Sequence, residues 1–185
     1  MRSSRLHALI VLAALALPAA PAAAQQGSLI DPRLLDPNTW YAMASRALAS
    51  AIQMAREETL KAGTHPIPPA IKSALAQAFP AEMLERVTYR VGKEGSLAIQ
   101  AFQYGDIQAM TLIDVIVFQK EQDALTNVGL WAHELIHVRQ YDTWGVEEFA
   151  RRYTQNHKEI EDEAYGFQAQ FEQKMGTKPP TGPRG

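Results

Sequence analysis

The spacing of apolar residues divides the chain into a helical first part, a short strand-like middle and a helical last part. Apolar residues recur at intervals of three to four over 40–61, which predicts a helix there. Asp36-Pro37-Asn38 is typical of a helix start, and Gly63 is placed to end the helix. A second helix is expected from Pro69 to Phe79 because Pro80 follows it, with a short helical turn after that.

The pattern changes to strand-like alternation after residue 86. Alternating apolar residues over 87–91 and 97–101, and a continuous β-branched run over 110–118, predict three strands. The short connections favour a small, mainly antiparallel sheet. An edge strand near 114–118 could hold an extended peptide by β-pairing. The alternative is ordinary sheet core, which we favour for the side chains themselves.

Helical periodicity returns in the last third of the chain. Helices are expected from Asn127 to Tyr141, from Val146 to Tyr153 and from Lys158 to Met175, with glycines at 145 and 176 as breaks. Helices, strands and then helices indicate the α+β class. The tail 177–185 holds three prolines and two glycines and is expected to be disordered.

The first 24 residues have the layout of a secretory signal peptide. Two arginines precede an apolar run over 8–17, and Ala22-Ala23-Ala24 supplies the small residues of a cleavage site. An apolar run of this length is too short to span a membrane. We therefore expect a periplasmic or secreted protein with no membrane span after cleavage, in which 25–176 form a single domain.

Composition removes several classes of function. The 185 residues carry 18 basic and 20 acidic side chains, a net charge of −2, which argues against nucleic acid as a partner. The chain has no cysteine, so disulfides, thiolate zinc fingers, iron–sulfur clusters and a cysteine nucleophile are excluded.

The strongest chemical signal is His133-Glu134-Leu135-Ile136-His137, an HExxH motif. Two histidines four residues apart lie on one face of a helix, where both imidazoles can bind one Zn²⁺ ion. Glu134 borders that face and can act as a general base without binding the metal. A chance histidine pair on a solvated helix is the alternative, but the apolar residues behind the pair argue against it.

A catalytic zinc site needs a third protein ligand. The HExxHxxGxxH pattern fails, because the chain has Gln140 and Thr143 at the required positions. The helix at 158–175 offers several carboxylates. Glu161 is our first choice because it adjoins the apolar stripe of that helix, one turn before a small alanine. The alternatives are Glu163, Glu159 and His157.

The HExxH segment, followed by Glu161-Asp162-Glu163-Ala164, resembles the gluzincin branch of zinc metallopeptidases. Tyr165 stands where that branch has an aspartate. The stretch 130–165 also resembles a bacterial HExxH domain found in exported proteins and at the head of some contractile-injection-system cargo. These resemblances imply a zincin-like fold but no known substrate; the metallopeptidase hypothesis makes a peptide or protein the expected substrate. They imply His133, His137 and Glu161 as zinc ligands and Glu134 as the base.

Three functional hypotheses follow. The first is an exported zinc metallopeptidase, in which Tyr165, His157, Tyr141 or Tyr153 could stabilise the oxyanion. The second is a non-catalytic, zinc-stabilised binding domain of an exported or toxin-associated system. The third is a structural interaction protein in which the motif is incidental. Retention of Glu134 favours the first hypothesis over the second, because a structural zinc site has no use for a base.

Overall fold

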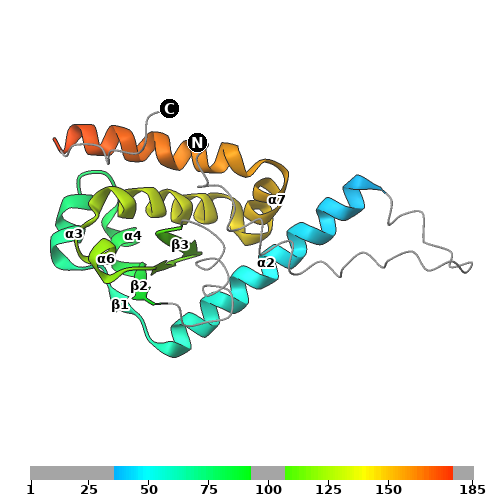
Figure 1. The fold of residues 1–185 in the computed structure, drawn as a ribbon, viewed down its shortest axis with the longest axis horizontal. Helices are drawn as coiled ribbons and strands as arrows, with labels where there is room; N and C mark the ends of the chain where they lie inside the picture. Colours follow the sequence, from blue (N-terminus) through cyan, green and yellow to red (C-terminus); the bar gives the residue numbers. More distant parts are fainter. Residues whose placement is uncertain (1–35, 93–106, 177–185) are drawn as a thin grey trace, which may run out of the picture.

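The computed structural model describes residues 36–92 and 107–176 (Figure 1). The expected signal peptide, the strand expected at 97–101 and the expected disordered tail lie outside the described residues. The described elements are helices and a four-stranded sheet, which confirms the α+β class. Among the described residues, no helix is long and apolar enough to cross a membrane.

Helix α2 spans Pro37–Ala62 and begins where the sequence predicts. The Asp36 side chain accepts a hydrogen bond from the backbone N–H of Asn38, and Pro37 occupies the first turn. Gly63, with φ of 95°, ends the helix. A bidentate ion pair between Arg56 and Asp114, at 2.5 and 2.9 Å, links α2 to the turn between strands β3 (Ala109–Leu112) and β4 (Val115–Phe118).

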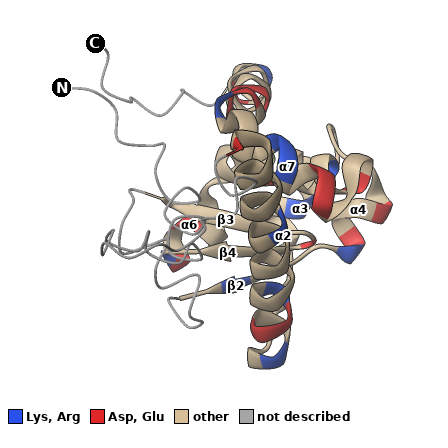
Figure 2. Cartoon of the chain, turned by 90° about the vertical axis from the view of Figure 1, so that its right-hand side faces the viewer, with Lys and Arg blue, Asp and Glu red and all other residues tan. Residues whose placement is uncertain are grey.

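Two short helices follow. Helix α3 spans Pro69–Leu75 and α4 spans Ala81–Arg86. The helix expected to reach Phe79 is therefore shorter, and the chain continues as turns up to Pro80. In Figure 2, acidic and basic positions are interspersed along α2, α4 and the long helix α7 (Val128–Lys174), in keeping with the near-neutral charge of the chain.

The sheet is mixed, so the expectation of a mainly antiparallel sheet is wrong. Its strands are β1 (His65–Pro66), β2 (Thr88–Val91), β3 (Ala109–Leu112) and β4 (Val115–Phe118), in the order β1-β2-β4-β3. β2 pairs with β4 in parallel, and the other two pairs are antiparallel. The parallel pair arises because β3 takes the sheet edge and β4 returns to lie beside β2.

The run over 110–118, expected as one strand, is a hairpin. At the turn, Ile113 has φ of 64°, a left-handed conformation that β-branched residues rarely adopt. The sequence has no glycine or asparagine there to signal the turn, and the hairpin was therefore not predicted. Strand β4 lies inside the sheet rather than at its edge, which contradicts peptide addition at 114–118 and agrees with the alternative of ordinary sheet core.

Strand β4 is buried on both faces. Val115 and Val117 pack in the cluster that includes Ala55 of α2, whereas Ile116 and Phe118 pack in the cluster that includes Trp131 of α7. The sheet is thus a middle layer between α2 and the helices of the opposite face (Figure 1). A strand enclosed in this way is apolar at every position, which explains the continuous run in the sequence.

Helix α7 spans Val128–Lys174 and is interrupted twice. Gly145 (φ 75°, ψ 164°) and Asn156 (φ −153°, ψ 70°) leave helical geometry. The interruptions divide α7 into the HExxH arm (128–144), the middle arm (146–155) and the return arm (157–174). These arms correspond closely to the three helices predicted from the sequence. The short helix α6 (Glu121–Thr126), which precedes them, was not predicted.

The return arm lies along the HExxH arm, on the side away from the sheet (Figure 1). Ala164 and Phe171 of the return arm belong to the same buried cluster as Leu130 and Val138 of the HExxH arm. The two arms are therefore held together by apolar contacts, and a residue of one can face a residue of the other.

Candidate metal centre

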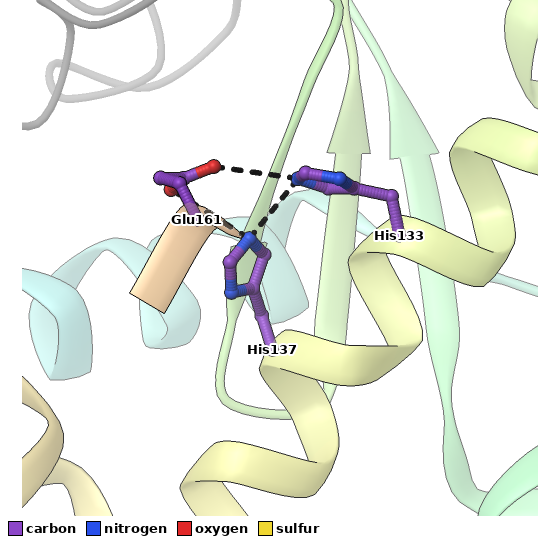
Figure 3. Close-up of side chains that lie close together, drawn as sticks. All are labelled: His133, His137 and Glu161. Atoms are coloured by element: carbon purple, nitrogen blue, oxygen red, sulfur yellow. Dashed lines mark hydrogen bonds and ion pairs between the residues drawn. The ribbon is translucent and has the colours of Figure 1, made fainter. Parts of the chain in front are cut away.

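His133 and His137 project from one face of the HExxH arm (Figure 3). Their Nε2 atoms are 3.2 Å apart, and the residues are only 5% and 7% exposed. The spacing of four residues places the imidazoles one turn apart on the helix. The helix itself thus brings two nitrogen donors to one point.

Glu161 reaches the same point from the return arm (Figure 3). Its Oε2 lies 3.5 Å from His133 Nε2, and its Oε1 lies 3.7 Å from His137 Nε2. A tetrahedral zinc ion with bonds of about 2.0–2.1 Å holds its ligand atoms about 3.3 Å apart. Potential ligand atoms of the three residues lie within 4.8 Å of one another, so the group has the composition and spacing to hold a metal ion.

The other third-ligand candidates are engaged elsewhere. Glu163 accepts hydrogen bonds from Arg139 at 3.1 Å and from Gln140 at 2.9 Å. Glu159 accepts one from the Asn156 side chain, and the His157 ring lies 6.0 Å from the ring of Tyr153. Of the candidates named from the sequence, only Glu161 joins the histidine pair.

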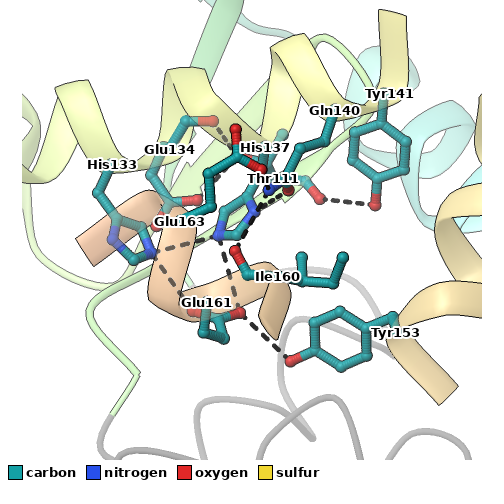
Figure 4. A network of polar contacts seen from close by, with 10 residues as sticks. All are labelled: Thr111, His133, Glu134, His137, Gln140, Tyr141, Tyr153, Ile160, Glu161 and Glu163. Atoms are coloured by element: carbon teal, nitrogen blue, oxygen red, sulfur yellow. Dashed lines mark hydrogen bonds and ion pairs between the residues drawn. The ribbon is translucent and has the colours of Figure 1, made fainter. Parts of the chain in front are cut away.

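Glu134 is buried, with 3% of its surface exposed. The hydroxyl of Thr111 on β3 lies 2.7 Å from its Oε2 (Figure 4). Burial raises the pKa of Glu134 from 4.5 to about 7, against the lowering effects of His137 and the Thr111 hydrogen bond. No motif in the sequence marks Thr111, because its contact with Glu134 depends on how β3 packs on the HExxH arm.

Glu161 is held as a carboxylate. Burial acts to raise its pKa, but the charge of His137 and hydrogen bonds to His133 and Tyr153 outweigh burial and lower the pKa to about 2. Tyr153 Oη donates to Glu161 Oε1 at 3.4 Å. The centre therefore has an anionic ligand beside two nitrogen ligands, a combination suited to a divalent cation.

The aromatic residues proposed for oxyanion stabilisation occupy different surroundings. Tyr141 is buried and donates to the backbone carbonyl of Thr111 at 3.4 Å, and burial raises its pKa well above 10. Tyr165 is 41% exposed, and its ring centroid lies 4.4 Å from that of His133. Tyr153 and Tyr165 thus contact ligand residues, whereas Tyr141 is directed to the sheet.

Gln140 is a further polar residue of the centre. In the sequence it is notable only because it replaces the glycine of the HExxHxxGxxH pattern. It is 2% exposed, and its Oε1 lies 2.8 Å from His137 Nδ1 (Figure 4). The signal available in the sequence was the spacing: a residue three positions after His137 lies on the same face of the helix as that histidine.

Comparison with known families finds a similarity over less than half of this chain. Neither the curated proteins nor the solved structures contain a significant match. Residues 66–145 match the family model described as the eCIS core domain, where eCIS stands for extracellular contractile injection system. The match includes the HExxH arm with His133, Glu134 and His137, and it ends before Glu161.

Proposed function

We propose that this protein is an exported, gluzincin-type zinc metallopeptidase with a zincin-like fold. The observation that carries the proposal is the convergence of His133, His137 and Glu161 ligand atoms within 4.8 Å. A buried carboxylate, that of Glu134, stands directly beside one of these ligands in the sequence. Two histidines and one glutamate form a known ligand set of catalytic zinc sites, which leaves a coordination position open.

His133, His137 and Glu161 would hold the ion. Zinc bound there would supply Lewis acidity, which polarises a carbonyl group and acidifies a water molecule. A peptide or protein substrate fits this chemistry.

Glu134 would move the proton. Its Oε2 is engaged by Thr111, which leaves Oε1 to accept a proton from the attacking water. The water oxygen forms a bond to the carbonyl carbon, the C–N bond breaks, and Glu134 passes the proton to the departing amine nitrogen. Thr111 fixes the carboxylate so that this transfer starts from one orientation.

Burial of both imidazoles favours a second candidate, a zinc-stabilised binding domain. Both histidines are less than a tenth exposed, as in closed structural sites. The two candidates differ in what they require of Glu134, since only the peptidase needs a proton acceptor.

The experiment combines metal analysis with one substitution. We expect about one zinc per purified chain, from one set of three ligands. Glu134→Gln should keep the zinc and abolish cleavage of a proteome-derived peptide library, read as new termini by mass spectrometry. The matched control is Glu159→Gln, which changes an exposed carboxylate of the return arm and should cleave the library at the wild-type rate.

Three results would contradict parts of the proposal. Cleavage by Glu134→Gln at the wild-type rate would exclude Glu134 as the base. A zinc-loaded wild type that cleaves nothing in the library would favour the binding domain. A chain that binds no zinc and gains no thermal stability from added zinc would exclude both.

Export is a separate part of the proposal. It is supported by the signal-peptide layout of residues 1–24 and by the match to a domain of extracellular injection systems. Expression in a bacterial host followed by fractionation should place the protein outside the cytoplasm, with an N-terminus at Gln25. Cytoplasmic protein that retains Met1 or Arg2 at its N-terminus would contradict it.

A further inference from the structure

Gln140 connects the two arms that supply the ligands (Figure 4). Its Oε1 lies 2.8 Å from Nδ1 of His137. Its Nε2 donates to the backbone carbonyl of Ile160 at 3.2 Å and to Glu163 Oε2 at 2.9 Å. One buried side chain therefore contacts a ligand of the HExxH arm and both flanks of the return-arm position that carries Glu161.

These contacts fix the orientation of the Gln140 amide. A backbone carbonyl and a carboxylate accept hydrogen bonds, so the NH₂ group of Gln140 must face Ile160 and Glu163. Its carbonyl oxygen is then left to face the imidazole. Because that oxygen can only accept, Nδ1 of His137 must be the nitrogen that carries hydrogen.

The tautomer of His137 decides which nitrogen can bind a metal. With hydrogen on Nδ1, the lone pair of the neutral imidazole is on Nε2, the atom 3.2 Å from His133 Nε2 and 3.7 Å from Glu161 Oε1. His133 differs, because its buried Nδ1 has no hydrogen-bond partner among the described residues. Of the two imidazoles, His137 is thus the one whose tautomer is set by a hydrogen bond at Nδ1.

We propose that Gln140 is a positioning residue, which selects the Nδ1–H tautomer of His137 and holds the return arm so that Glu161 faces the histidine pair. This inference rests on the metal site of the proposed function. Partners behind metal ligands typically contribute about 10–100-fold to metal affinity. Gln140 acts on both arms, so its removal affects two of the three ligands.

The first test is Gln140→Leu, which removes both sets of hydrogen bonds at similar size. We expect zinc affinity, measured by competition with a chromophoric chelator, to fall about 10–100-fold. Nitrogen-15 and carbon-13 shifts of the His137 ring in metal-free protein report the tautomer directly. The wild type should show hydrogen on Nδ1, and Gln140→Leu should lose that preference.

The second test reverses the hydrogen bond between positions 140 and 163. In Gln140→Glu with Glu163→Gln, the introduced carboxylate can accept from both Nδ1 of His137 and the introduced amide. Gln140→Glu alone and the double variant both present an acceptor to Nδ1 and should keep Nδ1–H, and both lose the hydrogen bond to the Ile160 carbonyl. The double variant should bind zinc more tightly than Gln140→Glu alone, in which two carboxylates face each other. Glu163→Gln alone is the control and should keep near-wild-type affinity, since its amide oxygen can still accept from Gln140.

The outcomes separate this inference from the proposed function. Hydrogen on Nε2 of His137 in the metal-free wild type overturns the inference, as does wild-type zinc affinity in Gln140→Leu. If Gln140→Leu fails to fold, the double variant decides the question. A zinc affinity no higher than that of Gln140→Glu then counts against the inference. A wild type that binds no zinc removes the metal site, while the His137 tautomer still tests the role of Gln140.

Discussion

The HExxH arm and the return arm supply ligands to the same centre, but they are built differently. Every residue from 129 to 138 of the HExxH arm is buried, whereas the return arm buries Ile160, Ala164 and Phe171 on one side, and Glu172 near its end. The HExxH arm is enclosed by the sheet, by α3 and by the return arm. The return arm covers the HExxH arm from outside. Two ligands therefore belong to the core, and the third depends on how a surface helix is placed against it.

This difference has a physical consequence for each kind of substitution. Close-packed interiors respond strongly to lost volume, while exposed helix positions tolerate change. Substitutions of the apolar core residues of the HExxH arm should act mainly on stability, and those of the polar residues near Glu161 mainly on metal affinity. The following predictions test that division, in order of decreasing expected effect.

The largest effect is expected in the core of the HExxH arm. Trp131 is fully buried, its ring centroid lies 4.7 Å from that of Phe118, and its Nε1 donates to the Ala124 carbonyl at 2.8 Å. Trp131→Ala should lower the free energy of unfolding by about 3–5 kcal/mol, measured by denaturant titration. Trp144→Ala is the control and should cost less, because Trp144 is only partly buried. Equal losses would contradict the expected dependence of the effect on burial.

The next effect concerns metal affinity on the return arm. Loss of a residue that hydrogen-bonds a metal ligand typically weakens binding about 10–100-fold. Glu161→Ala removes a ligand itself, so it should weaken zinc binding by more than that. Glu163→Ala, two residues further on, removes only hydrogen bonds to Arg139 and Gln140 and should weaken binding less. Chelator competition measures both. The opposite order would make Glu163 the ligand.

A smaller effect is expected where the two arms meet at the start of α7. A Cβ atom at Gly129 would overlap the carboxyl group of Glu172 on the return arm. Gly129→Ala must therefore move the Glu172 side chain, and because that side chain is flexible the cost should be no more than about 1 kcal/mol in thermal or chemical unfolding. Gly166→Ala is the matched control on the return arm, where nothing lies within 4 Å. It should stabilise by about 0.4–1 kcal/mol, because the helical conformation suits alanine.

The smallest effect is expected in the middle arm. Hydrogen bonds from Arg151 and Arg152 lower the pKa of Glu148 from 4.5 to about 2. A lowered folded-state pKa contributes stability above pH 4.5, and that contribution is lost as the pH falls towards about 2. The difference in unfolding free energy between wild type and Glu148→Gln should shrink over this interval. The pair is exposed and screened by solvent, so a large difference at pH 7 would be unexpected.

Local patterns were enough to predict most helix boundaries. Asp36 begins α2, Gly145 interrupts α7, and Gly63 ends α2, each because of a backbone or capping preference that belongs to the residue itself. The sheet was predicted less well. The turn at Ile113 uses a conformation that its side chain disfavours, so no local signal marks it. The parallel pairing of β2 with β4 depends on strand order, which periodicity does not contain.

The candidate centre shows the same limit. The spacing of His133 and His137 is a property of one helix, so the sequence by itself determined that two imidazoles share a face. The sequence could rank Glu161 above Glu163, but only the packing of the return arm on the HExxH arm decided which carboxylate faces the histidines. Thr111 and Gln140 likewise acquired their partners from that packing. Helix periodicity fixes which side chains of one helix share a face, whereas the contacts between two helices depend on how the whole core packs.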